Sequence, residues 1–203
     1  MLFRSAMPIA EPPVRLPIPP LPIGYRVAGV HAGLKRNPTR EDVALVVSDR
    51  PATAAGVYTT NLVRAAPVLF DRARTPGTGF RAVAVNSGNA NACTGERGLS
   101  DAERMAAITG GLIGVGAESV LVLSTGVIGE FLPLEKIERG LGLVAGRLGH
   151  DAEATVSAAR GMMTTDTRPK LSGSTFVSGG VTHTLFGMAK GAAMVGPRLA
   201  TML

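Results

Sequence analysis

Three short polar segments of this sequence combine hydroxyl, amide and glycine residues in patterns that can do chemistry. Ser124-Thr125-Gly126 follows an apolar run, and a turn there can aim the Thr125 hydroxyl and the Gly126 backbone N–H at one point, as in an oxyanion hole. Residues 86–95 (NSGNANACTG) carry amides and hydroxyls that hydrogen-bond either backbone or a ligand. Residues 163–167 (MTTDT) lie at the C-terminal end of an expected helix. Each segment also has a purely structural interpretation, as a turn, a loop or a helix end.

Other residue types that often carry chemistry are sparse. The single cysteine, Cys93, excludes an internal disulfide and a zinc site of several cysteines, and it favours a reducing compartment. His31, His150 and His183 lie far apart and lack metal-ligand spacing, so we expect no metal and no cofactor. The Gly140-x-Gly142-x-x-x-Gly146 spacing lies inside a helical stripe with no strand before it, which favours helix packing over dinucleotide binding.

Composition indicates a folded domain. The 203 residues are 45% hydrophobic and 18% charged, which is too apolar for intrinsic disorder. The net charge of +6 comes from scattered basic residues, and aromatic residues make up 4%, so we expect no nucleic-acid partner and no membrane partner. Because no apolar run approaches the roughly 18 residues that span a bilayer, the sequence predicts a cytoplasmic protein.

Periodicity predicts interleaved strands and helices, and hence an α/β fold. Residues 1–23 are Pro-rich and form an expected N-terminal arm, so the folded domain begins at Gly24. Gly179-Gly180 predicts a tight hairpin. The expected strands cover residues 24–33, 42–48, 55–60, 81–85, 119–124, 174–178 and 181–188.

Three helices are expected from capping signals and apolar stripes. Ser100 and Glu103 form a capping box at the start of the first helix. The second begins near Pro133, and the third follows Asp151 as its N-cap. The residues expected to face the core are Met105, Ile108, Leu112 and Val115, then Leu134, Ile137, Leu141, Val144 and Leu148, then Val156, Ala159 and Met163.

Six segments in this order resemble the glutamate N-acetyltransferase (ornithine acetyltransferase) family of arginine biosynthesis. They are VVSDRPATAAGVYTT with the following AAPV, NSGNANACTG, STGVIGE, MTTDTRPK, KG-x-x-M and the terminal ATML. The resemblance covers residues 22–203 and implies a layered αββα sandwich, similar to that of self-cleaving aminopeptidases. This sequence then holds its N-terminal half, with residues 24–200 as the α chain and 201–203 as the start of the β chain, because ATML ends in mid-pattern.

The resemblance also implies a site and a reaction. The precursor cuts itself between Ala200 and Thr201, and Thr201 becomes the nucleophile. Its freed α-amine, with an ordinary pKa near 8, then serves as the base that a Thr hydroxyl needs. Thr125 and Gly126 form the oxyanion hole, and Thr164, Lys190 and Thr201 contact substrate. N-acetylornithine acetylates Thr201, ornithine leaves, and glutamate takes the acetyl group; some members also use acetyl-CoA.

The expected partner is the missing β chain, in a heterotetramer of two α and two β chains. Two departures stand out: residues 190–194 read KGAAM where the family has KGSGM, and residues 196–200 read GPRLA where HPNMA is common. Two other interpretations remain open at this point. One is an amidase or aminopeptidase on the same scaffold, and the other is a truncated fragment without activity.

Overall fold

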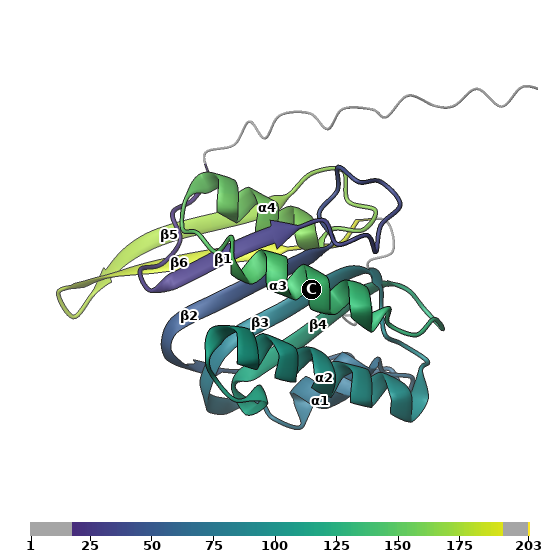
Figure 1. Cartoon of the computed structure of the whole chain (residues 1–203). Coiled ribbons are helices and arrows are strands. Elements are labelled where there is room, and N and C mark those ends of the chain that lie inside the picture. The colour runs from purple at the N-terminus through teal and green to yellow at the C-terminus, as the bar shows by residue number, and fades with distance from the viewer. Residues whose placement is uncertain (1–17, 193–202) are drawn as a thin grey trace, which may run out of the picture.

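A four-stranded sheet forms the centre of the molecule in a computed structural model that describes residues 18–192 and 203 (Figure 1). Its order is β1-β2-β3-β4; β1–β2 and β2–β3 are antiparallel and β3–β4 is parallel. A separate hairpin, β5–β6, follows the last helix. The elements are β1 Tyr25–Val30, β2 Val43–Ala54, α1 Ala66–Arg72, β3 Gly77–Asn89, α2 Gly95–Ile113, the 3-10 turn Ala117–Ser119, β4 Val120–Val127, α3 Leu134–Ala145, α4 Ala152–Met162, β5 Lys170–Ser178 and β6 Val181–Ala189.

One face of the sheet packs on α2 and α3. Strand residues alternate between the faces, so every second side chain of β1–β4 joins this core. Ile137, Leu141 and Val144 line one side of α3 and are fully buried there, as the apolar stripe predicts. Met105 is the largest fully buried contribution from α2.

The opposite face carries α4 over β1 and β2, where Ala154, Ala158 and Met162 pack on Val27 and Ala44. The helix begins as predicted, because the Asp151 carboxylate accepts the Ala154 backbone N–H at 2.8 Å. A Cβ at Gly29 would lie 1.9 Å from the Ser157 carbonyl oxygen, so α4 can approach this closely because β1 has a glycine there.

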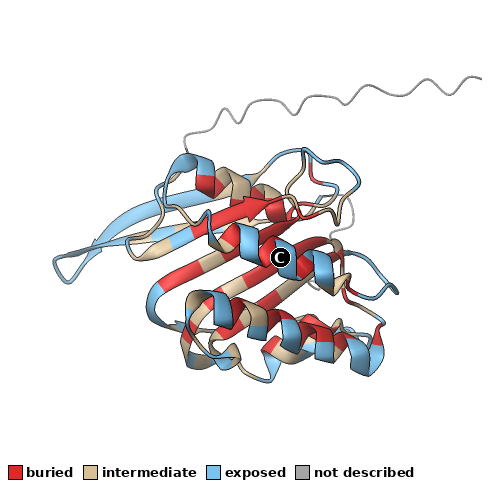
Figure 2. Cartoon of the chain, in the orientation of Figure 1, coloured by how far each residue is buried: buried red, intermediate tan, exposed pale blue. Residues whose placement is uncertain are grey.

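The β3–β4 part of that second face is less covered. Val83 and Leu123 point to it and are half-buried. The β5–β6 hairpin is mostly exposed (Figure 2). Four of its apolar residues are each more than half exposed: Phe176, Val177, Val181 and Leu185. A large apolar area of the described chain therefore faces outward.

The structure corrects three expectations about the helices and strands that precede β4. Helix α2 begins at Gly95, so Ser100 and Glu103 lie inside it as exposed residues and form no capping box. Its buried side carries Met105, and Ile108 and Val115 pack against the same core, but Leu112 is 44% exposed, so the predicted stripe is wrong at Leu112 alone. Residues 55–60 contain no strand; instead β2 itself continues to Ala54, and α1 was not foreseen. Among the described residues, no helix is both long and apolar enough to cross a membrane.

Candidate active site

The turn predicted at Thr125 and Gly126 is wrong: both residues lie in the last part of strand β4, which runs to Val127 and pairs in parallel with the end of β3. Gly126 pairs with Gly88, and Thr125 lies opposite Ser87 and Asn89 across a bulge. Gly126 has φ +138°, and a Cβ on it would lie 2.3 Å from the Gly88 carbonyl carbon. Only glycine fits this close approach, which fixes the position of this end of β4 against β3.

The NSGNANACTG segment has a structural role in this arrangement. Asn86 is fully buried; it accepts the Ser124 hydroxyl at 2.6 Å and donates to the Asn89 carbonyl at 2.8 Å. The Asn89 amide donates to the carbonyls of Glu130 and Phe131, both at 3.1 Å. These side chains therefore bind the backbone before and after the end of β4, through hydrogen bonds that are internal to the protein.

Thr125 and Lys190 meet in a buried corner. The Lys190 ammonium donates to the Thr125 hydroxyl at 2.9 Å, although the residues lie 65 positions apart. Lys190 is 4% exposed and Thr125 is 9% exposed. A hydroxyl that accepts from an ammonium keeps its own hydrogen for another acceptor, so Thr125 is set up to donate.

An aspartate that the sequence analysis did not single out joins the other segments to this corner. Asp166 is 2% exposed, and its carboxylate accepts the backbone N–H groups of Gly191 at 2.8 Å and Thr164 at 3.3 Å. It also accepts the Lys170 ammonium, and the Arg40 guanidinium donates to its backbone carbonyl at 3.3 Å. The carboxylate within MTTDTRPK was the available signal, but its partners lie up to 25 residues away.

Burial and neighbouring charges shift both titratable groups. Burial lowers the pKa of Lys190 below its usual range; the nearby Asp166 carboxylate opposes this, and Lys170 adds to it. Burial would raise the pKa of Asp166, but the Lys170 hydrogen bond and the backbone N–H groups of Gly191 and Thr164 outweigh it and hold that pKa below its usual range. The corner thus pairs an ionised carboxylate with a lysine that loses its proton more readily than an exposed one.

Four of the predicted site residues therefore lie in one region. Thr125 and Gly126 lie at the end of β4, Lys190 binds Thr125, and the Thr164 backbone binds Asp166, which also binds the residue after Lys190. Ala200 and Thr201 lie outside the described residues. Of the ATML motif the structure describes Leu203, whose carbonyl accepts the Lys190 backbone N–H at 3.0 Å. Within the described ranges, no cluster of His, Cys, Asp and Glu could hold a metal ion.

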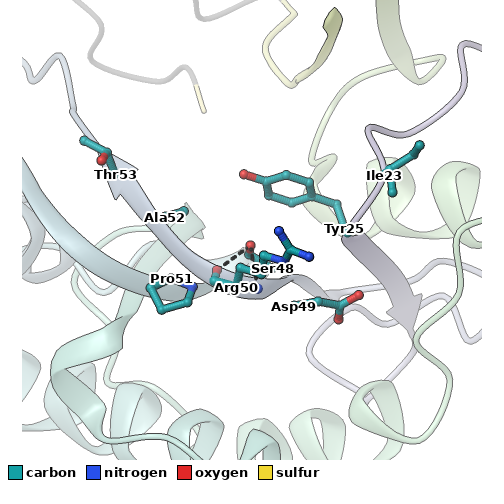
Figure 3. Close-up of a pocket in the computed structure, with 9 residues that line it drawn as sticks. Ile23, Tyr25, Ser48, Asp49, Arg50, Pro51, Ala52 and Thr53 are labelled. Atoms are coloured by element: carbon teal, nitrogen blue, oxygen red, sulfur yellow. Dashed lines mark hydrogen bonds between the residues drawn. The ribbon is translucent and has the colours of Figure 1, made fainter. Parts of the chain in front are cut away.

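A pocket of about 670 Å³ lies between the start of β1 and residues 48–53 of β2, separate from the region around Thr125 (Figure 3). Tyr25 and Ile23 form one side, and residues 48–53 form the other. Its carboxylate, Asp49, is exposed and paired with Arg26 at 2.9 Å. The pocket brings together no nucleophile with a base, so the chemistry favours the corner at Thr125.

Comparisons with known proteins agree with the resemblance. A family model described as the ArgJ family matches residues 26–203. The arginine biosynthesis bifunctional protein ArgJ of Geobacter sulfurreducens is 51% identical over 180 residues, which are 89% of this chain and 45% of the relative. A mitochondrial ArgJ protein of Yarrowia lipolytica is 44% identical, with 90% of this chain and 43% of the relative covered. The chain thus spans about half the length of the curated relatives it matches.

Two solved structures share the fold. An ArgJ protein of Bacillus halodurans has a TM-score of 0.82 and 38% identity, with 90% of this chain and 92% of that chain covered. An ornithine acetyltransferase of Mycobacterium tuberculosis, complexed with ornithine, has a TM-score of 0.79 and 39% identity, with 87% and 92% covered. The predicted fold class, the N-terminal half of a layered α/β fold, is confirmed.

Proposed function

This chain belongs to the ArgJ family of bifunctional arginine-biosynthesis proteins, and we propose that it supplies half of an enzyme that moves an acetyl group from N-acetylornithine to glutamate. The observation that carries the proposal is the buried corner in which Lys190 donates to Thr125, next to Gly126 at the end of β4. Ornithine bound in the Mycobacterium tuberculosis relative supports an ornithine-derived substrate.

In the proposed reaction, the Thr201 hydroxyl attacks the acetyl carbonyl of N-acetylornithine and its proton passes to the α-amine of Thr201. Thr125 and Gly126 donate to the oxyanion that forms, which stabilises the tetrahedral state. The C–N bond then breaks, and ornithine leaves with the proton. The glutamate amine attacks the acetyl-Thr ester in the reverse sequence and releases N-acetylglutamate.

Lys190 has two proposed parts in this reaction. Its hydrogen bond to Thr125 orients the hydroxyl, and its positive charge attracts the carboxylate of an amino-acid substrate. Thr164 is the proposed second substrate contact. Its backbone N–H binds Asp166, which also binds the backbone of Gly191, next to Lys190. The Leu203 carbonyl accepts the Lys190 backbone N–H at 3.0 Å.

Formation of the nucleophile requires the proposed cut between Ala200 and Thr201. The chain covers 92% of each of the two solved chains but 45% of the Geobacter relative, so those solved chains are about half as long as that relative. This supports an enzyme of two chains made from one precursor. We propose that two copies of each chain assemble, with the second chain covering the half-buried side chains of β3 and β4. A cytoplasmic location stays a prediction, since some relatives are mitochondrial.

The test uses a hybrid precursor, in which this chain is continued by the C-terminal part of the Geobacter relative. Intact mass should reveal two chains, the second beginning at Thr201, and the purified protein should form N-acetylglutamate and ornithine from N-acetylornithine and glutamate. Thr201→Ala should leave one uncut, inactive chain, whereas Thr182→Ala, on the exposed strand β6, should behave as wild type. A parallel assay with acetyl-CoA and glutamate decides whether that donor is used. Acetate or free amino acid as product, without N-acetylglutamate, would indicate a hydrolase instead.

A further inference from the structure

We propose that Asp166 is a positioning residue of this active site, whose carboxylate ties the Thr164 backbone to the Gly191 backbone and thereby fixes the Lys190 ammonium on Thr125. The inference rests on the proposed function. The Asp166 carboxylate binds Gly191, Thr164 and Lys170, whereas Lys190 binds Thr125, so Asp166 acts on Thr125 through Lys190.

The contacts place Asp166 where two chain segments must be joined. Thr164 follows α4, and Gly191 follows β6, with the whole exposed hairpin between them. The hairpin itself has few contacts with the rest of the described chain, so its base needs a fixed attachment. Asp166 provides one, since each of its oxygens accepts a backbone N–H, from Gly191 at 2.8 Å and from Thr164 at 3.3 Å. Lys190 is the residue before Gly191, so this attachment fixes the start of its side chain.

A carboxylate is required here because three donors converge on it. Besides the two backbone N–H groups, the Lys170 ammonium donates to the same oxygen as Gly191. An amide in this place would offer one acceptor oxygen where the carboxylate offers two, and it would carry no charge. Asn at position 166 therefore keeps the size of the side chain but leaves at least one donor unmatched.

The charge of Asp166 also acts on Lys190. Two charged groups act directly on Lys190: Asp166 in the loop after α4 and Lys170 at the start of β5. Two more lie on neighbouring elements: Arg40 donates to the Asp166 carbonyl, and Arg160 lies in the last turn of α4, a helix that contacts β6. Asp166 favours the protonated form of Lys190, and Lys170 disfavours it. Loss of the Asp166 charge and loss of the Lys170 charge should therefore shift the pKa of Lys190 in opposite directions.

This opposition separates a positioning role from a merely structural one. We would measure kcat/KM for N-acetylornithine from pH 6 to 11 in the hybrid precursor after processing. Asp166→Asn should lower kcat/KM and move the basic limb of the profile down by on the order of one pH unit, a tenfold change in charged lysine at a fixed pH. Lys170→Met should move that limb up. Asp49→Asn removes the carboxylate of an exposed ion pair and should leave the profile unchanged.

A second readout does not depend on turnover. Competitive labelling with acetic anhydride, analysed by peptide mass spectrometry, follows the reactivity of Lys190 against Lys136 as an internal reference in the same proteins. The midpoint for Lys190 should fall in Asp166→Asn and rise in Lys170→Met. If Asp166→Asn does not fold, the Lys170→Met result in both assays decides.

The outcomes distinguish the two proposals. A wild-type hybrid that is processed but transfers no acetyl group overturns the proposed function, and this inference with it. An active wild type in which Asp166→Asn and Lys170→Met shift the basic limb in the same direction, or leave it in place, overturns the role of Asp166 alone. A labelling midpoint for Lys190 that is unchanged in both Asp166→Asn and Lys170→Met would also overturn the role of Asp166.

Discussion

Removal of the Thr125 hydroxyl should separate the catalytic part of the site from its structural part. The hydroxyl accepts from Lys190 at 2.9 Å, and its own hydrogen is left to donate to the oxyanion. Thr125→Ala removes one oxyanion donor, which typically lowers kcat by about 10²–10³, or about 3–4 kcal/mol. The substitution also takes an acceptor from Lys190, which is 4% exposed, and hydrogen bonds to charged groups contribute about 1.5–3 kcal/mol.

These two losses fall on different measurements. The Lys190 hydrogen bond exists before substrate binds, so its loss in Thr125→Ala should lower the free energy of unfolding; with the Thr125 hydroxyl gone, it has no hydroxyl left to orient. The oxyanion bond exists mainly in the transition state, so its loss should lower kcat while KM for N-acetylornithine barely changes. Thr125→Ser keeps the hydroxyl and should lose no more than a few-fold in kcat through its freer χ1 angle.

The assay is ornithine release at saturating glutamate, with kcat and KM determined separately, together with urea unfolding of the same processed protein. Thr125→Ala should be slow and somewhat less stable, and Thr125→Ser should be close to wild type in both. A large rise in KM with kcat intact would refute the reasoning, because Thr125 would then bind the ground state. Equal loss in the Ala and Ser variants would also refute it, since the hydroxyl would not be the group that matters.

Three further outcomes are expected. The 203-residue chain alone should transfer no acetyl group, because the Thr201 nitrogen is still in an amide, and it should form oligomers on size exclusion through its uncovered apolar side chains; activity near ~1 s⁻¹ would contradict the proposed mechanism. Gly126→Ala should abolish transfer and destabilise the fold, while Gly111→Ala, where a Cβ meets nothing within 4 Å, should be neutral in both assays. Burial raises the pKa of Asp71 to about 7, so the charged form is disfavoured in the fold, and the free energy of unfolding should rise as pH falls from 8 to 5. Asp71→Asn should flatten that dependence in urea titrations, and an unchanged slope would exclude Asp71 as its source.

The elements that could be predicted from sequence are those with local causes. The Asp151 cap fixes the start of α4 within four residues, and Gly179-Gly180, at φ +59° and +77°, forms the hairpin turn. The stripe of α3 repeats every three or four residues and is buried as a unit. Each of these signals lies inside the element that it specifies, so no distant contact was needed to interpret it.

The start of α2 depends on contacts that its capping signal does not contain. The Asn91 amide donates to the Gly98 carbonyl at 2.8 Å, and the Thr94 hydroxyl donates to the Asn91 side chain at 2.8 Å. These bonds stabilise a helical turn before Ser100, so the helix extends back to Gly95. The capping box at Ser100 was a valid local signal, but a neighbouring polar loop outweighed it.

The site shows the same limit more strongly. Residue types and spacing pointed to the Thr125–Gly126 turn, but Lys190 came from the family resemblance alone, because nothing in the spacing connects positions 125 and 190. Asp166 was missed because its proposed role depends on its hydrogen bond with Gly191, which lies beyond the β5–β6 hairpin in the sequence. Contacts across such distances depend on how the strands pair, which residue patterns specify poorly.

Hydrogen-bond satisfaction, more than the number of polar residues, distinguishes the support of this site from its chemistry. The NSGNANACTG segment is rich in amides, yet the Asn86 and Asn89 amide groups donate to backbone carbonyls beside the end of β4. That satisfied network holds the end of β4 in place before substrate binds. Donors fixed in advance stabilise a transition state without reorganising. Thr125 accepts one bond and keeps one to give. In the proposed reaction the chemistry falls to Thr125, Gly126 and Lys190, and the amide-rich loop holds the backbone beside them.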